Sequence, residues 1–215
     1  DSKINLGGTA RIFLTYPSSF LNQLVLSSGD DSITLGPNAG VDSSGTASVS
    51  IGPSAGIDST GHFRVSIGSL AGANLGSSYG NNDVSIGHGA GFEALGSVSP
   101  GSNVHIGYLA GYLSDGRNSV HIAESAGQSQ EGDWNVTVGY YAGYDSEGDK
   151  NIYIGQYAGY NVKENSDSNI YIGRQAGSRA SGSNNIELVT NGAGFSILEG
   201  LSNRLSIENT IVGDT

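Results

Sequence analysis

One ten-residue pattern constrains this chain more than any other feature, because it recurs at a nearly fixed spacing. In the copy at 151–160, Asn precedes an apolar-x-apolar triplet, which is followed by Gly-x-x-Ala-Gly and an aromatic residue. Successive copies are 16 to 20 residues apart. The second apolar residue of each copy is Leu35, Ile51, Ile67, Ile86, Ile106, Ile122, Val138, Ile154, Ile172 and, in a degenerate copy, Leu188. A period of this length indicates stacked structural repeats.

The alternation inside each copy is typical of a β-strand. Ile152 and Ile154 are expected on one face of the strand, with Asn151 and Tyr153 on the other. We expect the two isoleucines and Ala158 to form the core of the coil. The recurring glycines mark corners, since Gly reaches positive φ without a steric penalty. The pattern predicts an all-β fold, a parallel β-roll or β-solenoid of about ten coils of 16–20 residues, each a short coil of two strands.

Three regions follow from the extent of the repeat. Residues 31–194 form the repeat β-roll, residues 1–30 are expected to be an N-terminal β cap or junction, and residues 195–215 a C-terminal β cap or linker. Short strands are expected outside the repeat at 4–6, 10–16, 20–26, 195–198 and 204–208. The longer repeats carry their extra residues in loops at 74–82, 93–102 and 161–168, which predicts an exposed loop face suited to specific contacts.

Composition excludes several classes of partner. The chain has 9 Lys and Arg against 20 Asp and Glu, a net charge of −11, whereas binding of phosphate groups needs clustered cations. Nucleic acid and membrane insertion are therefore not expected, and no apolar run approaches the roughly 20 residues of a membrane helix. The absence of Cys rules out disulfides and thiolate chemistry. This composition fits a virion or an extracellular location.

The narrow repeat also predicts association. Each coil can bury only a few apolar side chains, whereas ordering its backbone has a large entropic cost. We therefore expect the coils to pack against partner chains, most simply in a parallel homotrimer. End-to-end pairing through residues 1–30 or 195–215 into a filament is the alternative.

Two groups of side chains are candidates for metal binding. His105 and His121 occupy the same mid-strand position of consecutive copies, so they should stack, with six such side chains close together in a trimer. The alternative is a polar ladder, because the same position elsewhere holds Ser, Thr or Tyr. The pairs 131–133 and 147–149, both Glu-Gly-Asp, could hold Ca²⁺ or simply form a solvated acidic edge. We expect no cofactor, with Ca²⁺ as the alternative.

Tyrosines are the candidates for surface recognition. Exposed Tyr offers a flat apolar face with a polar tip, which suits a glycan; the alternative is stacking that rigidifies the roll or fills a seam between chains. The candidate contact residues are Tyr108, Tyr112, Tyr144 and Tyr160. The nucleophile-elbow pattern at 52–56 is a repeat position that happens to hold Ser54. We expect no catalytic residues and a protein that is not an enzyme.

The repeat resembles two related groups of proteins. Its [Ser/Asn]-Val-x-Ile-Gly-x-x-Ala core, as in 103–110, resembles the head repeats of trimeric autotransporter adhesins, which form left-handed parallel β-rolls packed as trimers. The fuller Asn-x-x-Ile-Gly-x-x-Ala-Gly form, as in 151–159, and the segment 202–209 are similar to tail fibre proteins of tailed bacteriophages. The resemblance covers about 31–194. It implies a rigid trimeric shaft that carries or contributes to receptor binding on a host surface, or, alternatively, a bacterial cell-surface adhesin or self-assembling extracellular filament subunit.

Overall fold

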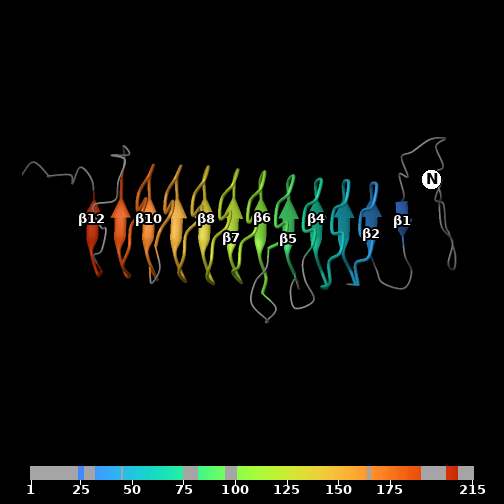
Figure 1. Ribbon diagram of the computed structural model, residues 1–215, viewed down its shortest axis with the longest axis horizontal. Coiled ribbons are helices and arrows are strands. Elements are labelled where there is room, and N and C mark those ends of the chain that lie inside the picture. Colours follow the sequence, from blue (N-terminus) through green and yellow to red (C-terminus); the bar gives the residue numbers. More distant parts are fainter. Residues whose placement is uncertain are drawn as a thin grey trace, which may run out of the picture.

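The computed structural model describes residues 24–26, 32–44, 46–74, 82–94, 101–163, 166–189 and 202–207. These residues form no helix, and their strands make one twelve-stranded sheet in which spatial order equals sequence order. Figure 1 shows the strands side by side along a rod. The strands are β1 (Leu24–Leu26), β2 (Ile33–Leu35), β3 (Val49–Ile51), β4 (Val65–Ile67), β5 (Val84–Ile86), β6 (Val104–Ile106), β7 (Val120–Ile122), β8 (Val136–Val138), β9 (Ile152–Ile154), β10 (Ile170–Ile172), β11 (Ile186–Leu188) and β12 (Leu205–Ile207).

The eleven strands β2–β12 are parallel, which confirms the predicted parallel β-solenoid. Equivalent positions pair with each other, as in His105 with His121 and Ile106 with Ile122. Each position of the repeat therefore becomes a straight column along the rod. Ten inter-strand steps give the sheet a length of about 48 Å.

Each coil contains one strand of three residues rather than the expected two, and turns make the rest. After β3, residues Gly52, Ser54, Gly56 and Asp58 have positive φ values of 127°, 53°, 63° and 51°. The N–H of Ala55 donates to the carbonyl of Gly52 at 3.2 Å, so the segment is a run of overlapping β-turns. Other N–H groups of this segment bond to the neighbouring coils, as Gly56 does to Ala71 at 2.9 Å. The turns thus form a second hydrogen-bonded wall of the solenoid.

The two glycines of each repeat are required for different reasons. A Cβ on Gly52, directly after the strand, would lie 2.7 Å from the backbone of Gly68 in the next coil. A Cβ on Gly56, in the Ala-Gly turn, would lie 2.5 Å from the hydroxyl oxygen of Ser50. The first glycine allows coils to stack closely, and the second leaves room for the mid-strand side chain that crosses the lumen.

The lumen therefore contains the mid-strand residues, which corrects the expected core. Tyr153 is fully buried, whereas Ile152 is half-buried and Ile154 is 38% exposed. The same pattern, a buried middle residue between two more exposed ones, holds from β3 to β10. The expectation that Ile152 and Ile154 form the core was wrong, because the alternation shows which residues share a face but not which face is enclosed. Ala158 is fully buried, as expected.

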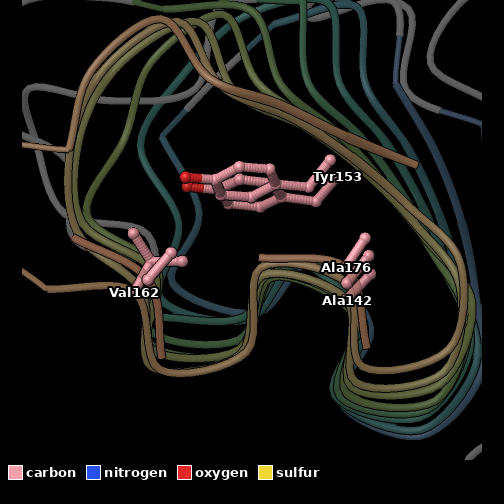
Figure 2. Packing of buried hydrophobic residues seen from close by; sticks show 7 residues of the cluster. Ala142, Tyr153, Val162 and Ala176 are labelled. Atoms are coloured by element: carbon pink, nitrogen blue, oxygen red, sulfur yellow. The ribbon is translucent and has the colours of Figure 1, made fainter. Parts of the chain in front are cut away.

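The enclosed space is narrow and filled by flat or small side chains. Figure 2 shows Tyr153 crossing the lumen, with Val162 at one wall and Ala142 and Ala176 at another. Tyr153 stacks on Tyr171 of the next coil with ring centroids 5.5 Å apart and planes 8° apart. Alanines of the Ala-Gly turn line the opposite wall in every described coil from Ala55 to Ala176. The lumen is thus a packed core.

The sheet also reaches beyond the predicted repeat. β1 falls within the strand expected at 20–26 and pairs antiparallel with β2. β12 falls within the strand expected at 204–208 and pairs parallel with β11, 19 residues after it, so it continues the solenoid. The strands expected at 4–6, 10–16 and 195–198 lie outside the described residues, as do residues 75–81, 95–100 and 164–165 of the three predicted insertion loops.

Candidate functional site

The candidate tyrosines lie on the turn wall and face away from the strand. In each repeat the mid-strand side chain packs against the second glycine of the turn, so outward side chains of the turn point to the opposite side of the rod. Tyr108 is 52% exposed, whereas Tyr112, Tyr144 and Tyr160 are half-buried. The structure places all four on one wall, but in two separate groups along the rod.

All four of these side chains stack one ring face on a neighbour one coil away, Tyr108 on His88 with ring centroids 5.4 Å and planes 25° apart. Tyr112 stacks on Phe92 at 5.6 Å with planes 7° apart. Tyr144 stacks on Tyr160 at 5.4 Å with planes 10° apart. Rings stacked along the rod axis present their edges and hydroxyls outward, with few free faces, and they cross-link adjacent coils. This geometry favours the rigidifying role for these pairs.

A second set of tyrosines completes a five-ring cluster on coils β8 and β9. Tyr140 is 38% exposed and lies edge-on to Tyr157, with centroids 5.5 Å apart and planes 89° apart. Tyr157 is in turn rotated by 74° from Tyr160. Tyr141 packs between these rings, 4.6 Å from Tyr140 and 5.0 Å from Tyr144. The ring orientations, which decide which faces are open to a ligand, could not be read from the sequence.

His105 and His121 lie inside the lumen, stacked at 5.1 Å with planes 17° apart. This corrects the expectation that six such rings would come together in a trimer, because each pair is enclosed by its own coils. Nδ1 of His121 is 2.8 Å from Oγ1 of Thr137, and Nδ1 of His105 has no hydrogen-bond partner. Burial lowers the pKa of His105 to about 4; burial and, secondly, the charge of His105 hold the pKa of His121 well below its usual value. The two stacked rings therefore form a polar ladder, which was the alternative to a metal site.

The Glu-Gly-Asp segments form a hydrogen-bonded column. The backbone N–H of Asp133 donates to Oδ1 of Asp149 at 2.8 Å, and that of Asp149 donates to Oδ1 of Asp167 at 2.8 Å. Arg117 forms an ion pair with Asp133, and its side-chain hydrogen bonds lower the pKa of that carboxyl group. Among the described residues, no group of three or more His, Asp or Glu is arranged to hold a metal ion. The column supports a structural role for these carboxylates.

Buried asparagines form a matching column just before the strands. Oδ1 of Asn135 accepts the N–H of Asn151 at 2.8 Å, and Oδ1 of Asn151 accepts that of Asn169 at 2.9 Å. Asn185 continues the series. Each amide satisfies a backbone group that the strand ladder leaves unpaired, so these Asn positions have a structural role.

Arg64 interrupts that column and was missed by the sequence reasoning. Its side chain is 3% exposed, Nη2 donates to the carbonyl of Ser59 at 3.4 Å, and Nε and Nη1 have no hydrogen-bond partner. Burial raises the pKa of nearby Asp83 to about 6, partly opposed by the N–H of Asn103 and by Arg64. Within the repeat at 31–194, Arg64 is a cation in a position that otherwise holds Asn, Ser or Asp, and this is the sequence signal that would have found it.

Comparison with protein-family models, with curated proteins and with solved structures finds no match to this chain. None of its described segments forms a helix able to cross a membrane. The rod has two exposed surfaces of distinct composition, the aromatic surface of its turn wall and the outward face of its sheet. These are the surfaces on which other molecules can act.

Proposed function

We propose that this chain is a structural and adhesive fibre segment of a phage tail or tail-like particle. In this role it is a rigid trimeric shaft that carries, or contributes to, binding of a host-surface receptor. The observation that carries the proposal is the unbroken parallel ladder from β2 to β12 with a packed lumen. Such a rod transmits force along its axis, because adjacent coils are joined by hydrogen bonds in the strand, in the turns and in the Asn column.

Receptor contact fits the turn wall best. The five-ring cluster around Tyr140 combines exposed aromatic surface with the polar side chains of Asn161 and Asp145, which are hydrogen-bonded at 2.7 Å. Aromatic faces beside amide and carboxylate groups suit sugar rings and hydroxyls. Three such surfaces on a trimer would act together, so weak single contacts would give firm attachment through effective concentration. No metal, cofactor or catalytic step enters this proposal.

The alternative is a bacterial cell-surface adhesin or a self-assembling extracellular filament. The feature that favours it is the apolar surface of β12, where Leu205 is 67% exposed and Ile207 is 47% exposed. Contiguous exposed apolar side chains near one end of the parallel sheet would suit contact with the next molecule of a filament.

Immunogold electron microscopy with antibodies raised against the purified chain separates the two roles. On native particle and cell preparations, the fibre proposal expects gold on appendages of virus-like particles. Gold on cell envelopes or on free filaments, with unlabelled particles, would refute it in favour of the alternative. Polymerisation of the purified chain that increases with concentration would point the same way.

A further inference from the structure

The outward face of the sheet has the composition expected of an interior. Strands β2–β12 turn their first and third residues outward and their middle residue into the lumen. In these eleven strands every outward residue, the first and the third of each strand, is Val, Ile or Leu. The enclosed middle residues are Ser, Thr, His, Tyr and Glu. A sheet with one face in water normally shows the reverse pattern.

In-register pairing arranges these side chains in two straight columns along the whole parallel sheet, which we call the apolar strand face. Each side chain is partly shielded by its neighbours above and below, yet Ile33, Ile154, Ile172 and Ile186 are still 37–39% exposed. Contiguous apolar surface of this extent on a soluble protein marks a contact surface. No charged or polar residue interrupts either column from β2 to β12.

We propose that the apolar strand face binds the same face of further copies of this chain. The inference deepens the proposed fibre role, on which it rests, by assigning the surface that joins the chains of the shaft. The face is straight, uncharged and repeats at every strand, so a partner that covers it must repeat at the same spacing. The same face of another copy has that spacing and composition along the full length of the sheet. A partner recognised by charge would find no group to pair with.

The size of the face agrees with a stable interface. An aliphatic side chain has roughly 60–120 Å² of apolar surface. If about a third of that surface is exposed at each of 22 positions, the exposed apolar area of the face is about 650 Å². Stable interfaces bury about 800 Å² on each partner. The apolar strand face therefore supplies most of the area that self-association requires.

Two exposed aromatic residues shortly precede strands of the apolar strand face, and the ring centroid of one of them, Trp134, also lies 5.6 Å from the Nζ of Lys150. Phe63 and Trp134, two residues before Val65 and Val136, are 62% and 51% exposed and have φ values of 58° and 57°. Asn tolerates that backbone conformation far better than a bulky aromatic, and Asn118 and Asn184 hold the same repeat position. Contact between these two aromatic side chains and a neighbouring copy would offset the backbone strain, since large aromatic residues contribute much of the binding energy of interfaces.

The chain contains no Cys, so a single introduced Cys reports proximity between copies directly. Ile122 lies on β7, the middle strand of β2–β12, and so meets its own counterpart whether the copies run parallel or antiparallel. Under mild oxidation, the folded Ile122→Cys variant should form disulfide-linked dimers at least ten times faster than Leu113→Cys. Leu113 is a matched control, 40% exposed on the turn wall. Equal rates would overturn the proposal.

Sedimentation equilibrium gives the second measurement. The wild-type chain is expected to sediment as an oligomer, and Ile122→Lys should weaken its association at least about 100-fold, because an ammonium group would be buried without a partner. Leu113→Lys should retain the wild-type mass. A monomeric wild-type chain, or an oligomer that Ile122→Lys leaves intact, would overturn the proposal. These outcomes are independent of gold labelling, so the assembly surface and the fibre role can fail separately.

Discussion

The buried histidine pair predicts that the protein loses stability in mild acid. His105 and His121 lie in the lumen, and the groups that face them among the described residues are Ser85, Thr137 and the glycines of the turn wall, none of which is charged. Burial depresses the pKa of His105 to about 4, whereas an unfolded chain binds the proton near 6.5. The unfolded state therefore takes up protons first as the pH falls. The stabilising contribution of the neutral pair is complete above pH 6.5 and is lost between 6.5 and about 4.

The magnitude follows from these two values. At pH 5, His105 alone removes about 2 kcal/mol from the free energy of unfolding, and His121 adds to that loss in the same direction. Asp83 acts in the opposite sense, because its folded pKa of about 6 lies above its unfolded value. Protonation of Asp83 between pH 7 and 5 adds about 1 kcal/mol to the free energy of unfolding, so the pH dependence of the wild type alone would understate the histidine effect.

A comparison of variants isolates the histidines. In the double variant His105→Thr/His121→Thr, both positions carry a residue found at the same repeat position in Thr34 and Thr137, and Asp83 is retained. Urea unfolding followed by circular dichroism at pH 7.5 and 5.0, at one protein concentration, should show the wild type losing at least 2 kcal/mol more than the double variant. His88→Ser removes an exposed imidazole from the turn wall and should retain the wild-type loss. Equal acid sensitivity of wild type and double variant would refute the burial argument.

Three further predictions test the coil itself by urea unfolding at neutral pH. Ala123 has a φ of 108° at a corner that Gly occupies in most other coils. Ala123→Gly should therefore stabilise the fold by about 1 kcal/mol, whereas Gly107→Ala should destabilise it. A loss of stability in Ala123→Gly would contradict the corner geometry. Asn151→Ala should lower the free energy of unfolding by about 1–3 kcal/mol, because it leaves the buried N–H of Asn169 unpaired. Asn151→Ser should cost less, because Ser119 accepts the N–H of Asn135 at the same repeat position. Equal losses in the two variants would argue against the column. The double variant Arg64→Asn/Asp83→Asn should raise the free energy of unfolding by about 1–3 kcal/mol, because it removes two buried charges. A lower free energy of unfolding would show that the two side chains stabilise each other.

The candidate site was only partly predictable. Repeat positions placed Tyr108, Tyr112, Tyr144 and Tyr160 on one wall, because equivalent residues of a solenoid form columns. Their ring orientations depend on neighbours one coil away, such as Phe92 under Tyr112, and on rotamers that a sequence pattern does not specify. Glycan contact by these residues stays a prediction.

The sequence by itself determined the stacking. A period of 16 to 20 residues with Gly at two corners predicts stacked coils, since Gly fits without strain where a Cβ at Gly52 would lie 2.7 Å from the backbone of the next coil. It also determined that Ile152 and Ile154 share a face. The tertiary structure alone decided that this face points outward. The lumen between the strand and the Ala-Gly turn is so narrow that it accepts one mid-strand side chain per coil, from Ser50 to the stacked ring of Tyr153, opposite a glycine. The aliphatic columns are therefore left on the outside of the rod.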